Sequence, residues 1–212
     1  MKTKPIIFNA QMVKALIDGD KIVTRRPVSP KPEPSGLGYD WWPSNRLESM
    51  VQVSGFKEIG CDYKRDFIKE TVKDACPIAQ VGDLLYVRET FRFFNSSDEC
   101  SCSDYCNCPT DGTPLYFATH NDCESKWKPS IHMPRKFSRL TLKVTDVRIE
   151  KLNDLRKNEE QIKKEGFESW PRFKHVWEGI YGQSKPNDYV WVIEFDVINQ
   201  NIDDYIKSLP SK

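Results

Sequence analysis

The sequence predicts an α+β fold, a small mixed β-barrel of about five to six strands with two to three flanking helices and two insertions. Two observations predict it. Short apolar runs suited to strands recur from the N-terminus to the C-terminus, and two helical patterns lie between the last two of these runs. With 212 residues, of which 38% are hydrophobic, the chain is long enough to bury the core of one generous domain.

The N-terminal part begins with a short strand, predicted by the apolar run from Ile6 to Phe8. Asn9 can cap the helix that follows, whose apolar face includes Val13 and Leu16, and Gly19 ends that helix. Residues 20–27 then form a turn and a short extended segment rich in charged and hydroxyl groups.

Residues 28–79 predict a surface insertion, because prolines and glycines interrupt every regular period there. Within it, a short helix is predicted from Asp62 to Val72, and we expect Trp41 and Trp42 to dock on the core. A second insertion, residues 92–128, contains a cluster of cysteines.

The rest of the chain supplies the remaining strands and helices. Strands are predicted at residues 84–87, 115–118, 140–149 (with a bulge) and 189–198, and helices at residues 154–165 and 171–181. Residues 1–198 therefore form a single domain in this prediction, and residues 199–212 form a polar, mobile tail.

Composition limits the classes of function. The formal net charge is +1, so any nucleic-acid partner must be sought in local clusters of charge. The N-terminal apolar run is too short for a signal peptide, and no apolar stretch is long enough to span a bilayer. We therefore expect a cytoplasmic protein without a membrane partner, and a monomer by default.

The segment from Lys21 to Arg26 is the first candidate site. Lys21, Thr24, Arg25 and Arg26 provide a lysine, a hydroxyl and two guanidinium groups within six residues. If the segment is a turn, all four converge; if it is extended, Lys21 and Arg25 share one side. Paired planar donors suit phosphate or carboxylate groups, and the alternative is a solvated basic turn.

Arg88 and Glu89 form a second candidate site at the end of a predicted strand. Charged groups at such a position often orient a ligand, although they also often form a mutual ion pair.

Residues 126–143 form a third candidate site. They contain six lysines and arginines and no acidic residue, with Trp127, His132 and Phe137 between them. Basic groups attract phosphates and aromatic faces stack on unpaired bases, so this stretch indicates nucleic-acid binding, with an ordinary solvated face as the alternative.

The fourth candidate is a metal site. Four of the seven cysteines, Cys100, Cys102, Cys106 and Cys108, fall within nine residues. Four thiolates can hold a structural zinc ion, and Cys123 or His120 can replace one of them. The alternative is a mobile loop with reduced thiols.

Several segments, taken in order, resemble the ASCH family of PUA-like barrels, in particular its phage and prophage members. The resembling segments are residues 5–9, 19–21 with 24–27, 82–91, 128–135, 142–146, 177–182 and 190–195. They run from end to end and omit only the two insertions and the tail.

This resemblance implies a barrel whose cleft binds RNA or a nucleoside. Some family members remove the acetyl group of N4-acetylcytidine with a lysine, a threonine and a glutamate. Lys21 and Thr24 match the first two, whereas Lys143 stands where the glutamate is expected on a later strand. Glu89 is then the candidate for the missing carboxylate.

The leading hypothesis is thus a protein that binds RNA or a modified nucleotide in a basic cleft. The predicted binding residues are Arg25, Arg26, Arg88, Lys128, Ser130, His132, Arg135, Lys136 and Arg139. A hydrolase, either an amidohydrolase or a ribonuclease that uses Lys21, Thr24 and Glu89, is the second hypothesis. A protein-interaction module of a phage is the third.

Overall fold

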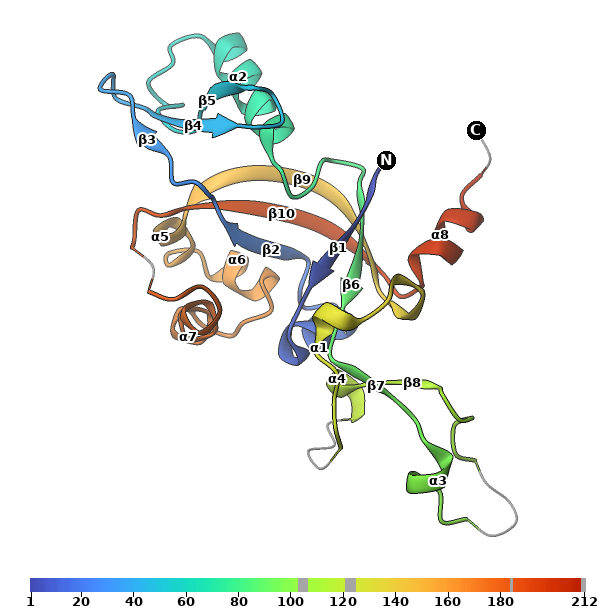
Figure 1. Cartoon of the computed structure of the whole chain (residues 1–212). Helices are drawn as coiled ribbons and strands as arrows, with labels where there is room; N and C mark the ends of the chain where they lie inside the picture. Colours follow the sequence, from blue (N-terminus) through green and yellow to red (C-terminus); the bar gives the residue numbers. More distant parts are fainter. Residues whose placement is uncertain (103–106, 121–124, 184, 211–212) are drawn as a thin grey trace. The chain divides into compact units, whose positions relative to one another are not determined.

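A computed structural model describes residues 1–102, 107–120, 125–183 and 185–210 (Figure 1). It has a mixed α+β fold. Five strands form one sheet in the order β1-β6-β9-β10-β2. They span Thr3–Ile7 (β1), Val23–Pro27 (β2), Leu84–Arg88 (β6), Thr141–Lys151 (β9) and Tyr189–Ile198 (β10). Strand β1 runs parallel to β6, and β2 runs antiparallel to β10 with Thr24 opposite Ile193.

The closed barrel expected from the sequence is not found among the described strands. The five-stranded sheet is open, with β1 and β2 at the ends of its order. The strand predicted at residues 115–118 does not belong to this sheet. It forms β8 (Pro114–Tyr116), which pairs with β7 (Phe91–Phe93) in a separate two-stranded ribbon.

The chain divides into two compact units, each built from three separate stretches. Unit 1 consists of Met1–Lys2, Gly19–Asp83 and Lys143–Asp196, and unit 2 of Thr3–Asp18, Leu84–Leu142 and Val197–Lys212.

Unit 1 contains the predicted insertion 28–79, which is more regular than the sequence suggested. Its three-stranded sheet consists of β3 (Glu33–Pro34), β4 (Asp40–Ser44) and β5 (Ser49–Gln52), and helix α2 (Asp62–Ala75) follows. Trp42 is buried and meets Trp191 of β10 edge-on, with ring centroids 5.4 Å apart. Trp41 is half-buried and packs on Tyr39 instead.

The other helices of unit 1 lie together on one side of β2 and β10 (Figure 1). They are α5 (Leu152–Leu155), α6 (Glu159–Lys164) and α7 (Trp170–Tyr181). The helix predicted at residues 154–165 is therefore divided in two, because Asn158 begins a new helix by accepting a hydrogen bond from the backbone N–H of Gln161. Phe167, Phe173 and Trp177 are buried; the Phe173 ring meets Phe167 edge-on and lies tilted against Trp177.

Unit 2 contains β1, β6 and several short helices. These are α1 (Ala10–Asp18), α3 (Ser96–Glu99), α4 (Phe117–His120), α8 (Ile202–Ser208) and the 3₁₀ turns Ser130–His132 and Arg135–Phe137. Asn9 caps α1 as predicted, because its side chain accepts from the N–H of Met12. The β7–β8 ribbon extends away from β6 toward α3 (Figure 1).

The predicted mobile tail instead contains helix α8. Asn201 caps it, and the Asn201 amide also donates to the backbone carbonyls of Arg135, Lys136 and Ser138, while Ile202 is fully buried. One buried residue and one multiply bonded cap are enough to order a segment that is otherwise polar. No helix among the described residues is both long and apolar enough to cross a membrane.

Candidate functional site

The segment that precedes and forms β2 is extended, which decides between the two conformations considered for Lys21 to Arg26. Lys21 is completely buried in unit 1. Its ammonium group donates to the backbone carbonyls of Val23 at 2.9 Å and Glu165 at 2.8 Å, and it lies 3.3 Å from the Glu165 carboxylate. All three donors of the lysine therefore have an acceptor inside the protein.

Arg25 shares the same carboxylate. Its backbone N–H and its guanidinium each donate to Glu165 at 3.0 Å, and the guanidinium also reaches Glu150 at 3.1 Å and Gln161 at 3.2 Å. Arg148 on β9 extends the cluster to Glu150, Asp146 and Glu194. We call Lys21, Arg25, Arg148, Glu150 and Glu165 the ion network; the first two and Glu165 are buried, whereas Arg148 and Glu150 are half-buried.

Burial changes the proton affinity of Lys21. Removal of its charged form from water lowers the pKa of Lys21 from 10.5 to about 8, and the attraction of Glu165 only partly opposes this effect. An amine that is partly neutral near physiological pH can act as a base or nucleophile, and such groups are typical of functional sites and of structural ion networks alike.

Glu165 was not recognised from the sequence. It directly follows α6 and precedes Gly166, which has a positive φ of 86° and turns the chain. A carboxylate at a helix C-terminus is repelled by the helix dipole, so its presence there signals a compensating partner. That signal was available in the sequence, but the partner lies 144 residues away along the chain.

The residues predicted to be catalytic are not assembled as one group. In an extended strand Thr24 and Arg25 point to opposite faces, so Thr24 does not share the face on which Arg25 meets Glu165. Thr24 is buried opposite Ile193. Lys143 is exposed on β9. The carboxylate that contacts Lys21 is Glu165, and Glu89 belongs to unit 2.

In unit 2, Glu89 is paired with Arg139. The carboxylate is almost fully buried and accepts two hydrogen bonds of 2.9 Å from the guanidinium. The same guanidinium lies 4.2 Å from the centre of the Tyr116 ring. The sequence had suggested Arg88 as a possible partner of Glu89. Arg88 instead donates to the backbone carbonyls of Ile131 and Met133.

Aromatic rings and basic side chains alternate on one face of the β7–β8 ribbon. The rings of Phe93 and Phe137 meet edge-on at 5.1 Å, and the Tyr116 hydroxyl donates to the Phe137 carbonyl. Lys128 lies 5.0 Å from the Phe93 ring centre, and Lys136 lies 4.8 Å from the Phe137 ring centre. We call the set formed by Phe93, Tyr116, Lys128, Lys136, Phe137 and Arg139 the basic–aromatic face.

The charge of this face comes from its two lysines. Lys128 and Lys136 are exposed, and no carboxylate of the described residues lies within ion-pair distance of either ammonium group. The charge of Arg139 is already compensated by Glu89. Phe93, Phe137 and Tyr116 are half-buried, so part of each ring is accessible.

The other predicted binding residues have varied surroundings. Arg135 is paired with Asp203 and donates to the Thr3 hydroxyl, and Arg26 donates to the Tyr181 hydroxyl at 2.7 Å in unit 1. Ser130 and His132 lie in a 3₁₀ turn of unit 2, where His132 is exposed. Arg25 is buried in the ion network and does not reach the surface.

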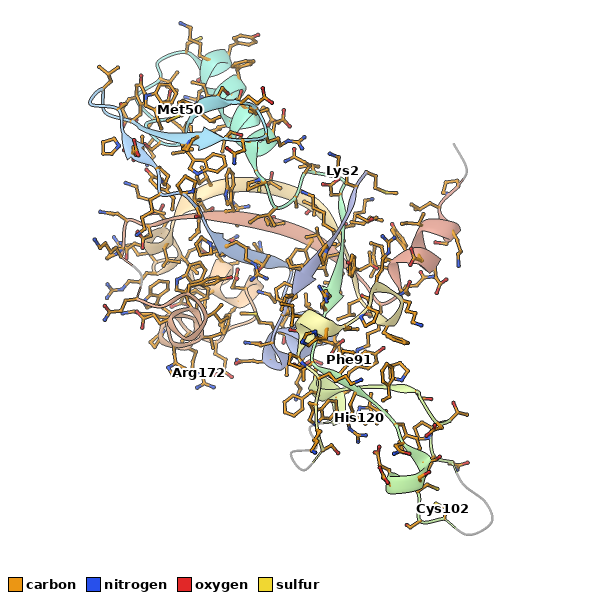
Figure 2. All side chains as sticks on the ribbon, viewed as in Figure 1. Lys2, Met50, Phe91, Cys102, His120 and Arg172 are labelled. Carbon is orange, nitrogen blue, oxygen red and sulfur yellow. The ribbon has the colours of Figure 1, made fainter. Side chains whose placement is uncertain are left out.

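Three of the four clustered cysteines lie together beyond α3. The sulfur atoms of Cys100, Cys102 and Cys108 are all within 4.8 Å of one another, close enough to hold a metal ion. Figure 2 shows that Cys102 lies farther from Phe91 than His120 does, in the segment that follows β7. Cys106 and Cys123 lie outside the described residues.

Comparison with known proteins found no match to the chain among family models, curated proteins or solved structures.

The lowered pKa of Lys21 predicts a specific dependence of stability on pH. Between about pH 8 and 10.5 the unfolded chain binds a proton at Lys21 that the folded protein has lost. The free energy of unfolding should therefore rise with pH across this window, by up to about 3 kcal/mol from this group. Urea unfolding of the wild type and Lys21→Met at a series of pH values measures the difference. Parallel curves for the two proteins would show that the pKa of Lys21 is not lowered.

Proposed function

We propose that unit 2 binds single-stranded nucleic acid, RNA in the first instance, on the basic–aromatic face. The observation that carries this proposal is the placement of two unpaired ammonium groups directly over two accessible rings, Lys128 over Phe93 and Lys136 over Phe137. Positive charge attracts the phosphates, and every base has a flat face that can stack on an aromatic ring.

The arrangement suits an exchange of partners on binding. In the free protein each ammonium group is held weakly by the ring beneath it, an interaction worth about 0.5–1 kcal/mol at an exposed site. The lysine stem is flexible, so the ammonium group can move to a phosphate and leave its ring to a base. One pair of residues thereby serves both the backbone and the base of a nucleotide.

A single strand is favoured over a duplex. Bases inside a duplex are already stacked and cannot lie on Phe93 or Phe137, whereas unpaired bases can. The pairing of Arg139 with Glu89 fixes Tyr116 and the adjoining ribbon without adding net charge. Affinity is therefore expected to be moderate and strongly dependent on salt.

The first test is fluorescence anisotropy with a short uridine-rich RNA, repeated over a range of salt concentrations. The double variant Lys128→Met/Lys136→Met should bind about ten-fold more weakly, and its salt slope should fall by about 1.4, since each phosphate contact of a single strand contributes about 0.7. Phe93→Leu or Phe137→Leu should weaken binding by about 1–3 kcal/mol for each lost stack and leave the slope unchanged.

The control removes two equally exposed lysines elsewhere, Lys14→Met/Lys163→Met. This variant should bind like the wild type. Equal losses of RNA affinity in the two double variants would show that only the net charge of the protein matters. Equal affinity for duplex and single-stranded RNA would contradict stacking of bases on the rings.

The cysteine cluster supports a second proposal, a structural zinc ion. Thiolates favour soft and borderline metals, and zinc is the usual occupant of a tetrahedral thiolate site. Zinc bonds of about 2.3 Å place tetrahedral sulfur ligands about 3.8 Å apart. That spacing is compatible with the separation of Cys100, Cys102 and Cys108.

Elemental analysis of purified protein tests this proposal. We expect one zinc ion per chain in the wild type and in Cys61→Ser, which changes an exposed cysteine outside the cluster. Cys102→Ser should lose the metal, and chelation should lower the melting temperature of the wild type and of Cys61→Ser but not that of Cys102→Ser. Metal-free wild-type protein whose melting temperature does not respond to added zinc would contradict it.

A hydrolase is the second candidate function, favoured by the contact of Lys21, with its lowered pKa, and Glu165. The resemblance to the ASCH family remains a prediction, and it suggests N4-acetylcytidine as the substrate to try. Glu165 then takes the role for which the sequence had suggested Glu89, and substrate binding must open a path to the buried lysine.

Turnover of N4-acetylcytidine by three variants separates the two carboxylates. Lys21→Met and Glu165→Gln should abolish deacetylation, whereas Glu89→Gln should retain it, and circular dichroism confirms that each variant is folded. In the wild type, kcat/KM should change with an apparent pKa of about 8, the value for Lys21. Deacetylation that persists in folded Lys21→Met and in folded Glu165→Gln would exclude this mechanism.

A further inference from the structure

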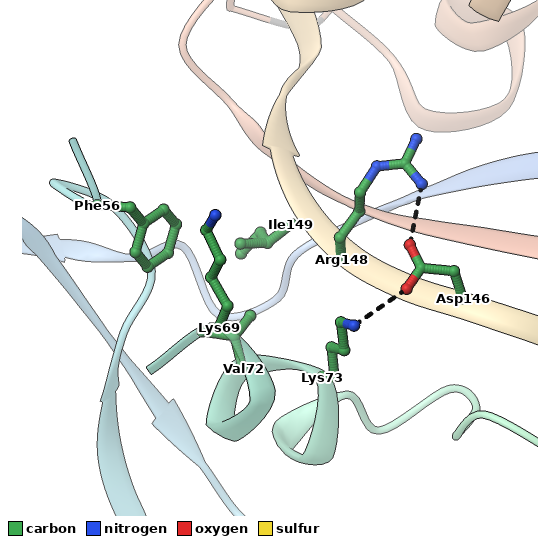
Figure 3. Close-up of a pocket in the computed structure, with 7 residues that line it drawn as sticks. All are labelled: Phe56, Lys69, Val72, Lys73, Asp146, Arg148 and Ile149. Atoms are coloured by element: carbon green, nitrogen blue, oxygen red, sulfur yellow. Dashed lines mark hydrogen bonds and ion pairs between the residues drawn. The ribbon is translucent and has the colours of Figure 1, made fainter. Parts of the chain in front are cut away.

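A pocket of about 320 Å³ lies within unit 1, between helix α2 and strand β9, and none of its lining residues belongs to the basic–aromatic face. Lys69, Val72 and Lys73 line it from α2, Asp146, Arg148 and Ile149 line it from β9, and Phe56 closes one end (Figure 3). This volume is at the lower end of the range in which proteins bind small molecules.

Two of the three basic side chains that line the pocket, Lys73 and Arg148, are paired with a carboxylate. Asp146 lies between Lys73, at 3.3 Å, and Arg148, at 3.2 Å, and neutralises part of the charge of each. Lys73 also contacts Glu70, and Arg148 contacts Glu150 and Glu194. Lys69 differs, because no carboxylate of the described residues lies within ion-pair distance of its ammonium group. The pocket therefore keeps one uncompensated cation.

The remaining walls are apolar. Figure 3 shows the Lys69 side chain rising between the Phe56 ring and Ile149, so a flat apolar group placed beside Phe56 lies next to the ammonium group. Val72 is buried beneath these residues. An aromatic wall with an adjoining unpaired cation is suited to a ligand that combines a flat ring with a negative charge.

A second hollow adjoins the first. It is also about 320 Å³ in volume, and Phe56 and Ile149 line both hollows. Its wall contains Lys57, Lys151 and Tyr189 together with the carboxylates of Glu58, Glu150 and Asp154. A ligand seated against Phe56 therefore has room to extend toward hydrogen-bonding groups as well as toward Lys69.

We propose that this pocket binds a small aromatic anion, of the kind represented by a nucleoside monophosphate. The ring lies against Phe56 and Ile149, and Lys69 receives the anionic group. Lys73 and Arg148 form the rest of the polar rim, and Asp146 holds both in place. The site is independent of the basic–aromatic face, since it uses different residues in a different unit.

Isothermal titration calorimetry tests the site with CMP and AMP as probes, in parallel with cytidine, adenosine and inorganic phosphate. The wild type should bind a monophosphate at least ten-fold more tightly than the matching nucleoside, and phosphate alone should bind more weakly still. Lys69→Met keeps the aliphatic stem and should erase the preference for the charged ligand. Phe56→Ala should weaken monophosphate and nucleoside alike.

Lys64→Met is the matched control, because Lys64 is an exposed lysine of the same helix and does not line the pocket. It should bind the probes like the wild type. Binding that is equally strong in Lys69→Met, phosphate binding as strong as monophosphate binding, or an absence of heat at millimolar probe would each overturn the proposal. RNA binding by the Lys69→Met variant should be unchanged, so failure here is distinguishable from failure of the nucleic-acid interface.

Discussion

The shared carboxylate of Glu165 is the contact on which the charged interior of unit 1 depends. It accepts from the Lys21 ammonium group, from the backbone N–H of Arg25 and from the Arg25 guanidinium. Two cations buried without such an acceptor would lose their hydration with little in return. These hydrogen bonds of Glu165 hold the end of α6 against the start of β2. The same link sets the environment in which the pKa of Lys21 is lowered.

The two units use charge in different ways. Unit 1 pairs Arg25 and Arg148 with carboxylates, and Arg148 alone meets three of them. Unit 2 pairs Arg139 with Glu89 but leaves Lys128 and Lys136 over aromatic rings. A chain of net charge +1 can therefore present a local basic surface.

Local signals explain which parts of the fold were predictable. Strand β10 and helices α1 and α7 have regular apolar spacing, and Asn9 and Gly182 mark helix ends. The cysteine cluster was also visible as a local pattern. Long-range pairing was not, so neither the contact of Glu165 with Lys21 nor the pairing of β8 with β7 could be derived from spacing. Helix α8 was missed because its order comes from Asn201 binding a distant turn.

The alternation of the two units along the chain constrains how the protein is made. Unit 1 needs residues up to Asp196, and unit 2 needs the segment after it, so neither is complete until the ribosome has released most of the polypeptide. Domains built from one continuous stretch can fold one after another during synthesis. Each of these two units, by contrast, can fold completely only after its last stretch has been synthesised. No single cut of the chain separates them, because the stretches of the two units alternate along it.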